Sequence, residues 1–394
     1  MQNKVILKKG KEESLQRFHP WVFSGAIASI DGDPEEGDVV DVYTSRNEWI
    51  AVGHIQVGSI AVRVLSFTPV SIDADFWAGR LYNARMVRCA LGLVGRKDHT
   101  VYRLVHGEGD GLPGLIIDIY GHTAVIQAHS IGMHRSRFEI AEALKKVMDG
   151  QVQAVYYKSE TTLPDKAPIE LNDCYLDGGP INGDEWLEYG MKMPVDWISG
   201  QKTGLFIDQR ENRALLEKMS EGRTVLNMFC YTGGFSLAAL RGGAKLVHSV
   251  DSSARAIELT RNGVENNFPG DMRHEAFVMD AFQYLDNMNP VYDLIVLDPP
   301  AFAKHKDALK RALIGYRRLN EKAFQKIRPG GLLFTFSCSQ VVTKEQFRTT
   351  VFTSAALAGR NVRILHQLHQ PADHPVDIFH PEGEYLKGLV LYVE

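Results

Sequence analysis

Residues 224–235 read TVLNMFCYTGGF, an apolar run followed by a turn of small residues. The run has the length of a buried strand, and the turn opens a stretch of helical character. Similar apolar runs occupy residues 245–251, 274–280, 293–298 and 331–338, each followed by a helical pattern. Strands that alternate with helices are typical of a doubly wound parallel sheet. We therefore predict an α/β fold for residues 194–394.

The chain closes with two further apolar runs, at residues 362–368 and 388–394. No helical pattern separates them, so we expect them to form an antiparallel hairpin added to the parallel sheet. This addition distinguishes the sheet of a methyltransferase from a plain dinucleotide-binding fold.

The first half of the chain has a different pattern. Residues 1–70 contain short alternating apolar runs broken by turn signals, which predict a small β-barrel. Residues 71–193 combine a helix from Asp73 to about Leu93 with several β-rich runs and a second helix from about Met133 to Met148. The apolar face of that second helix is expected to consist of Phe138, Ile140, Ala141, Leu144 and Val147. The middle segment is therefore predicted to be an α+β domain.

The bulk composition is that of a globular cytoplasmic protein. The chain has 394 residues, of which 44% are hydrophobic and 23% charged, and no segment approaches the ~20 apolar residues of a membrane span. The four cysteines lie far apart without metal-binding or disulfide-framework spacing, so each is expected to be a free thiol.

The net charge of −4 gives no general sign of a nucleic-acid partner, but two segments are locally basic. The first lies between Arg80 and Arg103 and contains Arg85, Arg88, Arg96 and Lys97 as well. The second contains Lys304, Lys306, Lys310, Arg311, Arg317, Arg318, Lys322, Lys326 and Arg328. Either segment could be a solvated helix face or could contact phosphates.

Candidate cofactor contacts follow the strands, because ligands of open α/β sheets bind beyond the carboxyl ends of the strands. Gly233 and Gly234 would let backbone amides approach a ligand at the start of a helix. Asp251 ends the second strand, where a carboxylate can bind a ribose diol. Asp280 ends the third strand and could meet an adenine amino group. Each residue alone could simply be a polar strand end, but their joint order indicates S-adenosylmethionine.

The fourth strand ends in Asp298-Pro299-Pro300-Ala301-Phe302. The two prolines stiffen the exit of the strand and would direct Asp298 toward a planar substrate, with Phe302 available to stack on it. Upstream, residues 202–210 could form a lid over the cofactor or simply cap the next helix. The motif favours methylation of a base.

The fifth strand ends in Phe336-Ser337-Cys338-Ser339, which places a thiol at the same sheet edge as Asp298. Methylation of cytosine at C5 requires a nucleophile that adds to C6, and a cysteine thiolate can supply it. Alternatively, Cys338 could be an inert buried thiol, as we expect for Cys230. The histidines His366, His369, His374 and His380 show no metal-binding spacing, and no metal is predicted.

Several motifs resemble the bacterial 23S ribosomal RNA large-subunit cytosine-C5 methyltransferase family. They are FHPWVFSGAI (18–27), GEGDGLPGLIIDIYG (107–121), KTGLFIDQRENR (202–213), NMFCYTGGFS (227–236), LDPPAFAK (297–304), FTFSCS (334–339) and ADHPVDIFHPEGEYLKG (372–388). The resemblance spans nearly the whole chain. It implies an N-terminal PUA domain that binds RNA, a central α+β domain and a C-terminal Rossmann-like methyltransferase domain that uses S-adenosylmethionine.

The resemblance implies that Cys338 is the covalent nucleophile and that Asp298 orients the base. Better-known RNA cytosine-C5 enzymes carry a second cysteine three residues after the motif aspartate, where this chain has Ala301, so the group that removes the C5 proton is left open. The expected cofactor contacts are Asn227, Phe229, Tyr231, Thr232, Gly233, Gly234, Asp251, Ser252, Asp280, Ala281, Asp298, Lys202, Phe206, Asp208 and Gln209. The expected substrate contacts are Pro299, Pro300, Phe302 and Lys304.

The expected partner is 23S ribosomal RNA of the large subunit, and a homodimer is considered as well. Two alternatives stay open at this point. Methylation of a nitrogen on an RNA purine would need the Asp-Pro-Pro motif but not Cys338. A non-catalytic RNA-binding assembly factor would need neither a functional cofactor pocket nor the thiol.

Overall fold

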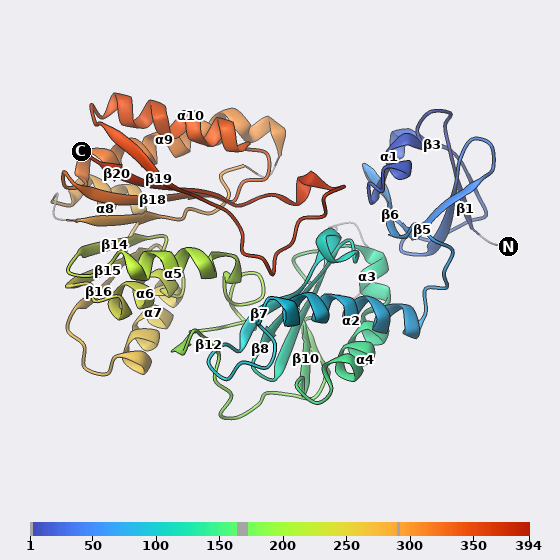
Figure 1. The fold of residues 1–394 in the computed structure, drawn as a ribbon, viewed down its shortest axis with the longest axis horizontal. Helices are drawn as coiled ribbons and strands as arrows, with labels where there is room; N and C mark the ends of the chain where they lie inside the picture. The colour runs from blue at the N-terminus through green and yellow to red at the C-terminus, as the bar shows by residue number, and fades with distance from the viewer. Residues whose placement is uncertain (1–2, 164–171, 290–291, 304) are drawn as a thin grey trace. The chain divides into compact units, whose positions relative to one another are not determined.

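The computed structural model describes residues 3–163, 172–289, 292–303 and 305–394. The chain forms two compact units, and the chain passes between them more than once (Figure 1). Unit 1 contains residues 1–190, 196–204 and 372–383, and unit 2 contains residues 191–195, 205–371 and 384–394. Within the described residues, no helix combines the length and apolar character that crossing a membrane requires.

The N-terminal part of unit 1 is a six-stranded sheet. Its strands are β1 (Lys4–Leu7), β2 (Trp21–Phe23), β3 (Ile27–Asp31), β4 (Val39–Tyr43), β5 (Trp49–Ile55) and β6 (Ile60–Ser66), with a short helix α1 (Glu13–Gln16). The strand order is β2-β6-β5-β4-β1-β3. Alternating residues such as Val5, Leu7, Val40 and Val42 are fully buried, which is the period-two pattern that the sequence predicts.

The second part of unit 1 is a five-stranded sheet in the order β11-β10-β9-β8-β7. Its strands are β7 (Val101–His106), β8 (Leu115–Tyr120), β9 (Thr123–Ala128), β10 (Ala154–Tyr157) and β11 (Cys174–Asp177), and a short strand β12 (Leu187–Glu188) follows. Helices α2 (Ala74–Ala90), α3 (Ile131–Arg135) and α4 (Arg137–Met148) accompany the sheet, and α2 packs on α4. Trp77, Leu81, Ile140 and Leu144 belong to the core that the helices share with the sheet.

The predicted helix from Met133 to Met148 is wrong in two respects. The structure has two helices, α3 and α4, because Ser136 adopts a non-helical conformation between them. In addition, Phe138 is 57% exposed, and the Arg137 guanidinium covers its ring at 4.4 Å. Ile140, Ala141 and Leu144 are buried as predicted.

Unit 2 contains a seven-stranded sheet in the order β16-β15-β14-β17-β18-β20-β19. Its strands are β14 (Thr224–Met228), β15 (Leu246–Asp251), β16 (His274–Val278), β17 (Leu294–Leu297), β18 (Gly331–Ser337), β19 (Val362–Leu368) and β20 (Lys387–Val393), and a short strand β13 (Met191–Lys192) precedes them. The helices are α5 (Arg210–Lys218), α6 (Gly234–Arg241), α7 (Ala254–Asn267), α8 (Ala281–Asn287), α9 (Leu309–Lys326) and α10 (Lys344–Leu357).

In unit 2 the helices form two layers. Helices α5, α6 and α7 lie on one face of the sheet, and α8, α9 and α10 lie on the other (Figure 1). The inner strands β14, β17 and β18 are buried along their whole length, as expected for parallel strands covered on both faces. Strands β14 to β18 are parallel to one another, whereas β20 pairs antiparallel with both β18 and β19. The predicted hairpin is confirmed, with its last strand inserted between β18 and β19.

Candidate active site

The turn between β14 and α6 has an unusual backbone. Phe229, Tyr231 and Gly233 all have positive φ angles, of 57°, 47° and 82° respectively. Aromatic residues rarely adopt this left-handed region, and such strain concentrates at functional sites. The turn therefore brings Phe229, Tyr231 and buried Thr232 to the carboxyl end of β14, where the sequence predicts a cofactor.

Gly233 and Gly234 are required by packing within the protein. A Cβ atom on Gly233 would lie 2.6 Å from Cγ2 of Thr260, and one on Gly234 would lie 2.9 Å from Cδ of Arg213. The sequence interpretation, in which the glycines serve close approach of a ligand, missed this reason. The glycines allow the turn to lie directly against α5 and α7.

Asp251 connects the turn to the end of β15. Its carboxylate accepts hydrogen bonds from the Tyr231 N–H at 3.0 Å and from the Ser253 N–H at 2.9 Å. Asp280 caps α8, because its Oδ1 accepts from the N–H groups of Phe282 and Gln283. Ser252 and Asp280 are exposed. The carboxylates of Asp251, at the end of β15, and of Asp280, just after β16, thus lie at the carboxyl ends of neighbouring strands.

Asn227 provides the test of whether a cofactor fits this edge. Its side chain is 1% exposed, and its amide donates to Ser236 Oγ at 2.9 Å. The Asn227 Oδ1 atom is buried and has no hydrogen-bond partner within the described residues. A buried acceptor without a partner is costly, so a donor group is expected there. The amino group of S-adenosylmethionine is such a donor, and the residues present fit that cofactor.

The segment before β14 forms hydrogen bonds to the Asp298 motif. Gln209 donates from Nε2 to Asp298 Oδ1 at 3.1 Å, and Asn212 donates to Gln209 Oε1 at 2.6 Å. Asp208 is 5% exposed and accepts from the Tyr385 hydroxyl at 2.7 Å. The ring of Phe206 packs edge-on against Tyr231 at 4.9 Å.

The contacts of Asn212 and Tyr385 were not predicted from the sequence. Both residues lie within quoted motifs, yet only the fold shows which carboxylate or amide each one meets. Lys202, the first residue of the predicted lid segment, belongs to unit 1, whereas Phe206, Asp208 and Gln209 belong to unit 2.

Cys338 and the Asp298 motif lie together. The Cys338 thiol faces the carbonyl of Pro299 at 3.9 Å, and Cys338 is half-buried. Pro300 is exposed, whereas Phe302 packs its ring on Tyr316 with 4.6 Å between the centroids. Phe302 is therefore engaged by the core of unit 2, and its stacking on a substrate stays a prediction. Lys304 lies outside the described residues.

All four cysteines are free thiols, as predicted, but they differ in environment. Cys230 is buried beside the cofactor turn, and burial raises its pKa far above the ordinary range, with Asp251 acting in the same direction. A thiol in this state is not a nucleophile. Cys230 is therefore a packed thiol, as expected from the sequence.

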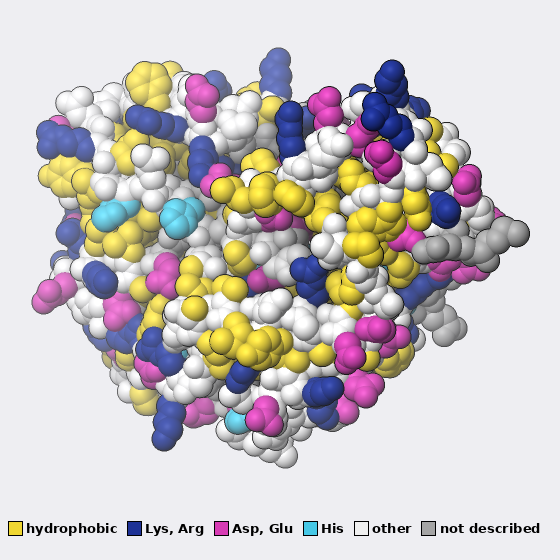
Figure 2. All heavy atoms as spheres, turned by 45° about the vertical axis from the view of Figure 1, so that its right-hand side comes forward, with side chains coloured by type: hydrophobic (Ala, Val, Ile, Leu, Met, Phe, Trp, Pro, Cys, Tyr) yellow, Lys and Arg dark blue, Asp and Glu magenta, His cyan; other side chains and the backbone are white. Residues whose placement is uncertain are grey.

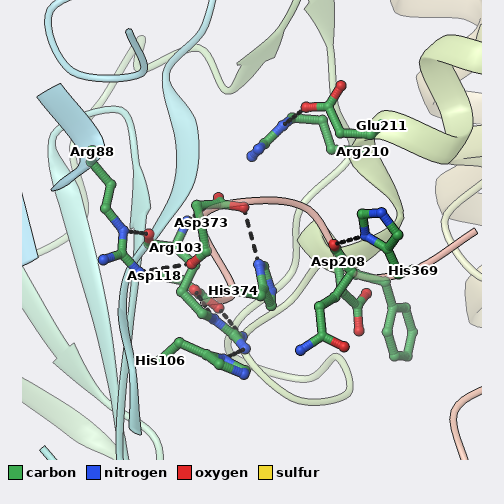
Figure 3. Close-up of polar contacts among 12 residues, drawn as sticks. Arg88, Arg103, His106, Asp118, Asp208, Arg210, Glu211, His369, Asp373 and His374 are labelled. Carbon is green, nitrogen blue, oxygen red and sulfur yellow. Dashed lines mark hydrogen bonds and ion pairs between the residues drawn. The ribbon is translucent and has the colours of Figure 1, made fainter. Parts of the chain in front are cut away.

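Two arginines of the first basic segment have a role that neither sequence interpretation included. Arg88 is fully buried, and it donates to Asp110 Oδ2 at 2.8 Å and to the Asp373 carbonyl at 2.7 Å. Arg103 makes a bidentate ion pair with buried Asp118 at 2.7 and 2.8 Å. Figure 3 shows Arg88 and Arg103 within this polar network, together with His374. These arginines stabilise unit 1 and are not available to phosphates.

The residues of the second basic segment differ in environment: some form ion pairs and others are exposed. Lys322 pairs with Asp286, and Arg328 pairs with Asp293 at 3.1 Å. Lys306, in a 3₁₀ turn just before α9, and Lys310 and Arg311, at the start of α9, are exposed. Figure 2 shows Lys and Arg side chains interspersed with Asp and Glu over the face drawn, in keeping with the small net charge. Exposed cations that follow the Asp298 motif are the better candidates for phosphate contact.

One group of described side chains has metal-ligand geometry. Ligand atoms of His19, His380 and Glu382 lie within 4.8 Å of one another. However, the Trp21 N–H donates to His19 Nδ1 at 3.2 Å, which leaves the proton of the neutral ring on Nε2. That protonated nitrogen faces Glu382 Oε2 at 3.6 Å. The geometry favours a histidine–carboxylate contact over a metal site.

Comparison with known protein families identifies the fold. The model of a PUA-like domain matches residues 5–67. The model of the S-adenosylmethionine-dependent methyltransferase family matches residues 159–380, which is more than half of the chain. The chain belongs to the S-adenosylmethionine-dependent methyltransferase family. The predicted combination of a PUA-like domain and a Rossmann-like methyltransferase domain is thereby confirmed.

This methyltransferase has relatives that it matches over their full length. It is 39% identical to the ribosomal RNA large subunit methyltransferase I of Aeromonas hydrophila, over 99% of both chains. It is also 39% identical to the protein of that name from Escherichia coli O1:K1 / APEC, over 100% of both chains.

Solved structures agree with this assignment. A protein from Streptococcus mutans, assigned as a SAM-dependent methyltransferase, superposes with a TM-score of 0.84 at 25% identity over 100% of both chains. A second structure, of a similarly assigned methyltransferase complexed with SAH, gives a TM-score of 0.85 at 25% identity over 100% of both chains. The predicted cofactor, S-adenosylmethionine, is confirmed.

Proposed function

We propose that this methyltransferase forms 5-methylcytosine in 23S ribosomal RNA through a covalent adduct between Cys338 and C6 of the base. The names of the relatives support ribosomal RNA of the large subunit as the substrate. One observation carries the choice of carbon over nitrogen. The half-buried Cys338 thiol faces the Pro299 carbonyl at 3.9 Å, directly beside Asp298.

The proposed chemistry assigns one task to each residue. When bound, S-adenosylmethionine supplies an electrophilic methyl group. The Cys338 thiolate adds to C6 and makes C5 electron-rich enough to accept that methyl group. Loss of the C5 proton then expels the thiolate and restores the ring. Asp298, held by Gln209, would face the N3 and amino edge of the cytosine and accept a hydrogen bond from the amino group.

We propose the predicted contact sets for this site. Asn227 would accept from the amino group of the cofactor and Asp251 would bind its ribose, because their positions at the carboxyl ends of β14 and β15 suit those groups. The proposed cofactor set is completed by Phe229, Tyr231, Thr232, Gly233, Gly234, Ser252, Asp280, Ala281, Asp298, Lys202, Phe206, Asp208 and Gln209. The proposed substrate contacts are Pro299, Pro300, Phe302 and Lys304.

The proposed division of the chain assigns RNA binding to its N-terminal part. We propose residues 1–70 as the PUA-like RNA-binding domain, residues 71–193 as the central domain and residues 194–394 as the methyltransferase domain. A ribosomal RNA substrate would place the protein in the cytoplasm. No observation on the described residues supports a homodimer, and it is not part of the proposal.

The proposal is tested by incubating the protein with methyl-labelled S-adenosylmethionine and unmodified ribosomal RNA, followed by digestion to nucleosides. Wild type should place the label in 5-methylcytidine. Cys338→Ala should lose at least ~10³-fold in rate, because the nucleophile is removed. Cys89→Ala is the matched control, since Cys89 is also half-buried but lies on α2, and it should retain activity.

The other outcomes identify the alternatives. Label in a methylated purine would establish nitrogen methylation, and full activity of Cys338→Ala would refute the covalent adduct with that residue. A wild-type protein that fails to bind S-adenosylmethionine would instead be an RNA-binding assembly factor. Membership in the methyltransferase family argues against this last outcome.

A further inference from the structure

Lys387 is a buried lysine next to the candidate nucleophile. It is the first residue of β20 and pairs with Ser337, the last residue of β18. Its side chain is 6% exposed. Lysines are almost never buried without a specific reason, because removing an ammonium group from water is costly. The position of this lysine therefore needs an explanation that packing alone does not give.

The ammonium group of Lys387 holds the backbone just after Cys338. Nζ donates to the Ser339 carbonyl at 2.6 Å. Ser339 is further fixed through its hydroxyl, which accepts from the Ala303 N–H at 3.3 Å and bonds the Tyr316 hydroxyl at 2.9 Å. Ser337 and Ser339, the residues on either side of Cys338, are both fully buried. The thiol thus projects from a backbone that is fixed on both sides.

The charges around Lys387 are few. Cys338, Lys344 and Glu384 act on it, and exposed Lys344 is itself paired with Glu384 at 2.9 Å. Burial lowers the pKa of Lys387 to about 8, and Cys338 acts in the opposite direction. Because this value lies above 7, the group is mainly an ammonium ion at neutral pH. The interaction is mutual, so a cation that is favoured by a thiolate also favours that thiolate.

We infer that Lys387 is a positioning residue that fixes the backbone of Cys338 and favours the thiolate form of its side chain. The inference rests on the proposed function, in which Cys338 is the nucleophile. It assigns a role to Lys387, a residue of the C-terminal motif for which the sequence alone suggests none. Lys387 acts through Cys338 and does not itself need to touch the RNA.

The test measures the rate at which iodoacetamide alkylates Cys338 as a function of pH, followed by peptide mass spectrometry. Lys387→Gln keeps a donor for the Ser339 carbonyl but removes the charge. It should alkylate about ten-fold more slowly at pH 7, because a smaller fraction of the Cys338 side chain is thiolate when the nearby cation is absent. Lys387→Arg keeps the charge and should react within about two-fold of wild type. Lys245→Gln, which removes an exposed lysine of unit 2 that is not among the charges acting on Lys387, is the control and should leave the profile unchanged.

A Lys387→Gln profile that superimposes on wild type would overturn the inference, and so would a ten-fold loss in Lys387→Arg. The arginine variant keeps the test decisive if the glutamine variant does not fold, which circular dichroism would show. The readout is also independent of the methylation assay. If Cys338→Ala still methylates RNA, the covalent mechanism fails, whereas the alkylation profile still reports whether Lys387 and Cys338 are coupled.

Discussion

At the scale of single residues, Arg88 shows how much the fold changes the meaning of a charge. In the sequence it is one of several basic residues that could contact phosphate. In the structure it is fully buried and joins α2 to Asp110 and to the carbonyl of Asp373. Counting charges along a chain does not reveal a partner that is 285 residues away in sequence.

We predict that Arg88→Met destabilises unit 1 by about 3–5 kcal/mol, because it leaves the Asp110 carboxylate and the Asp373 carbonyl without their buried partner. Urea unfolding followed by tryptophan fluorescence measures the change. Arg96→Met is the matched control. Arg96 pairs with Asp98 at the surface, where both side chains are exposed, so its loss should not shift the transition measurably. Equal shifts in the two variants would show that the Arg88 network is not stabilising.

At the scale of secondary-structure elements, the turn between β14 and α6 is the part of the site that depends most on local geometry. Gly233 has a φ of +82°, and a Cβ there would lie 2.6 Å from Cγ2 of Thr260 on α7. Gly222 also has a positive φ, of +68°, but no atom lies within 4 Å of its Cβ position. Substitutions at these two glycines therefore distinguish the effect of backbone strain, expected at both, from the effect of a steric clash, expected only at Gly233.

We predict that Gly233→Ala weakens S-adenosylmethionine binding by at least about ten-fold in calorimetric titration, because the displaced turn carries the proposed cofactor contacts. Gly222→Ala costs only the left-handed backbone term of about 1–2 kcal/mol in stability and should leave affinity unchanged. Adding Thr260→Ser to Gly233→Ala removes Cγ2 and should restore part of the affinity. If the double variant binds no better than the single one, the collision is not the cause.

The elements that were predicted well are those that are buried on both faces. Strands β14, β17 and β18 are continuous apolar runs, so their positions along the chain and their polar ends could be taken directly from the sequence, whereas their order in the sheet was not predicted. The break at Ser136 was missed because the apolar period continues across it from α3 into α4. The contact between Lys387 and the backbone next to Cys338 was missed because only the pairing of β18 with β20 brings residues 337 and 387 together.

At the scale of the whole molecule, the small net charge limits how the protein can bind RNA. With a net charge of −4, binding should show only a modest salt dependence, because few cations neutralise phosphates. The buried ion pairs of Arg88 and Arg103 remove two further cations from the accessible surface. Exposed cations near the Asp298 motif should therefore account for a measurable share of the salt dependence.

We predict that replacing both Lys306 and Lys310 with Ala lowers the slope of log affinity against log salt by about 1.4–1.8, if each lysine neutralises one phosphate. Filter binding to ribosomal RNA fragments over a range of salt concentrations measures this slope. Replacing Lys218 and Lys245 with Ala, two exposed lysines elsewhere in unit 2, changes the net charge equally and should leave the slope unchanged. Equal slopes for the two double variants would show that Lys306 and Lys310 do not contact the RNA phosphates.

The division of the chain into units has a consequence for its synthesis. Unit 1 includes residues 372–383, and Arg88 and Arg103 obtain hydrogen-bond partners from Asp373 in that segment. A nascent chain emerges from the ribosome beginning with its N-terminus. Arg88 and Arg103 can form their ion pairs with Asp110 and Asp118 early, but the Arg88 guanidinium and the Arg103 backbone N–H lack their bonds to Asp373 until that residue has been translated. Unit 1 is the first to emerge, but it is completed only when residues 372–383 have been made, after most of unit 2. A ribosome that stalls before residue 372 therefore releases a chain in which neither unit is complete.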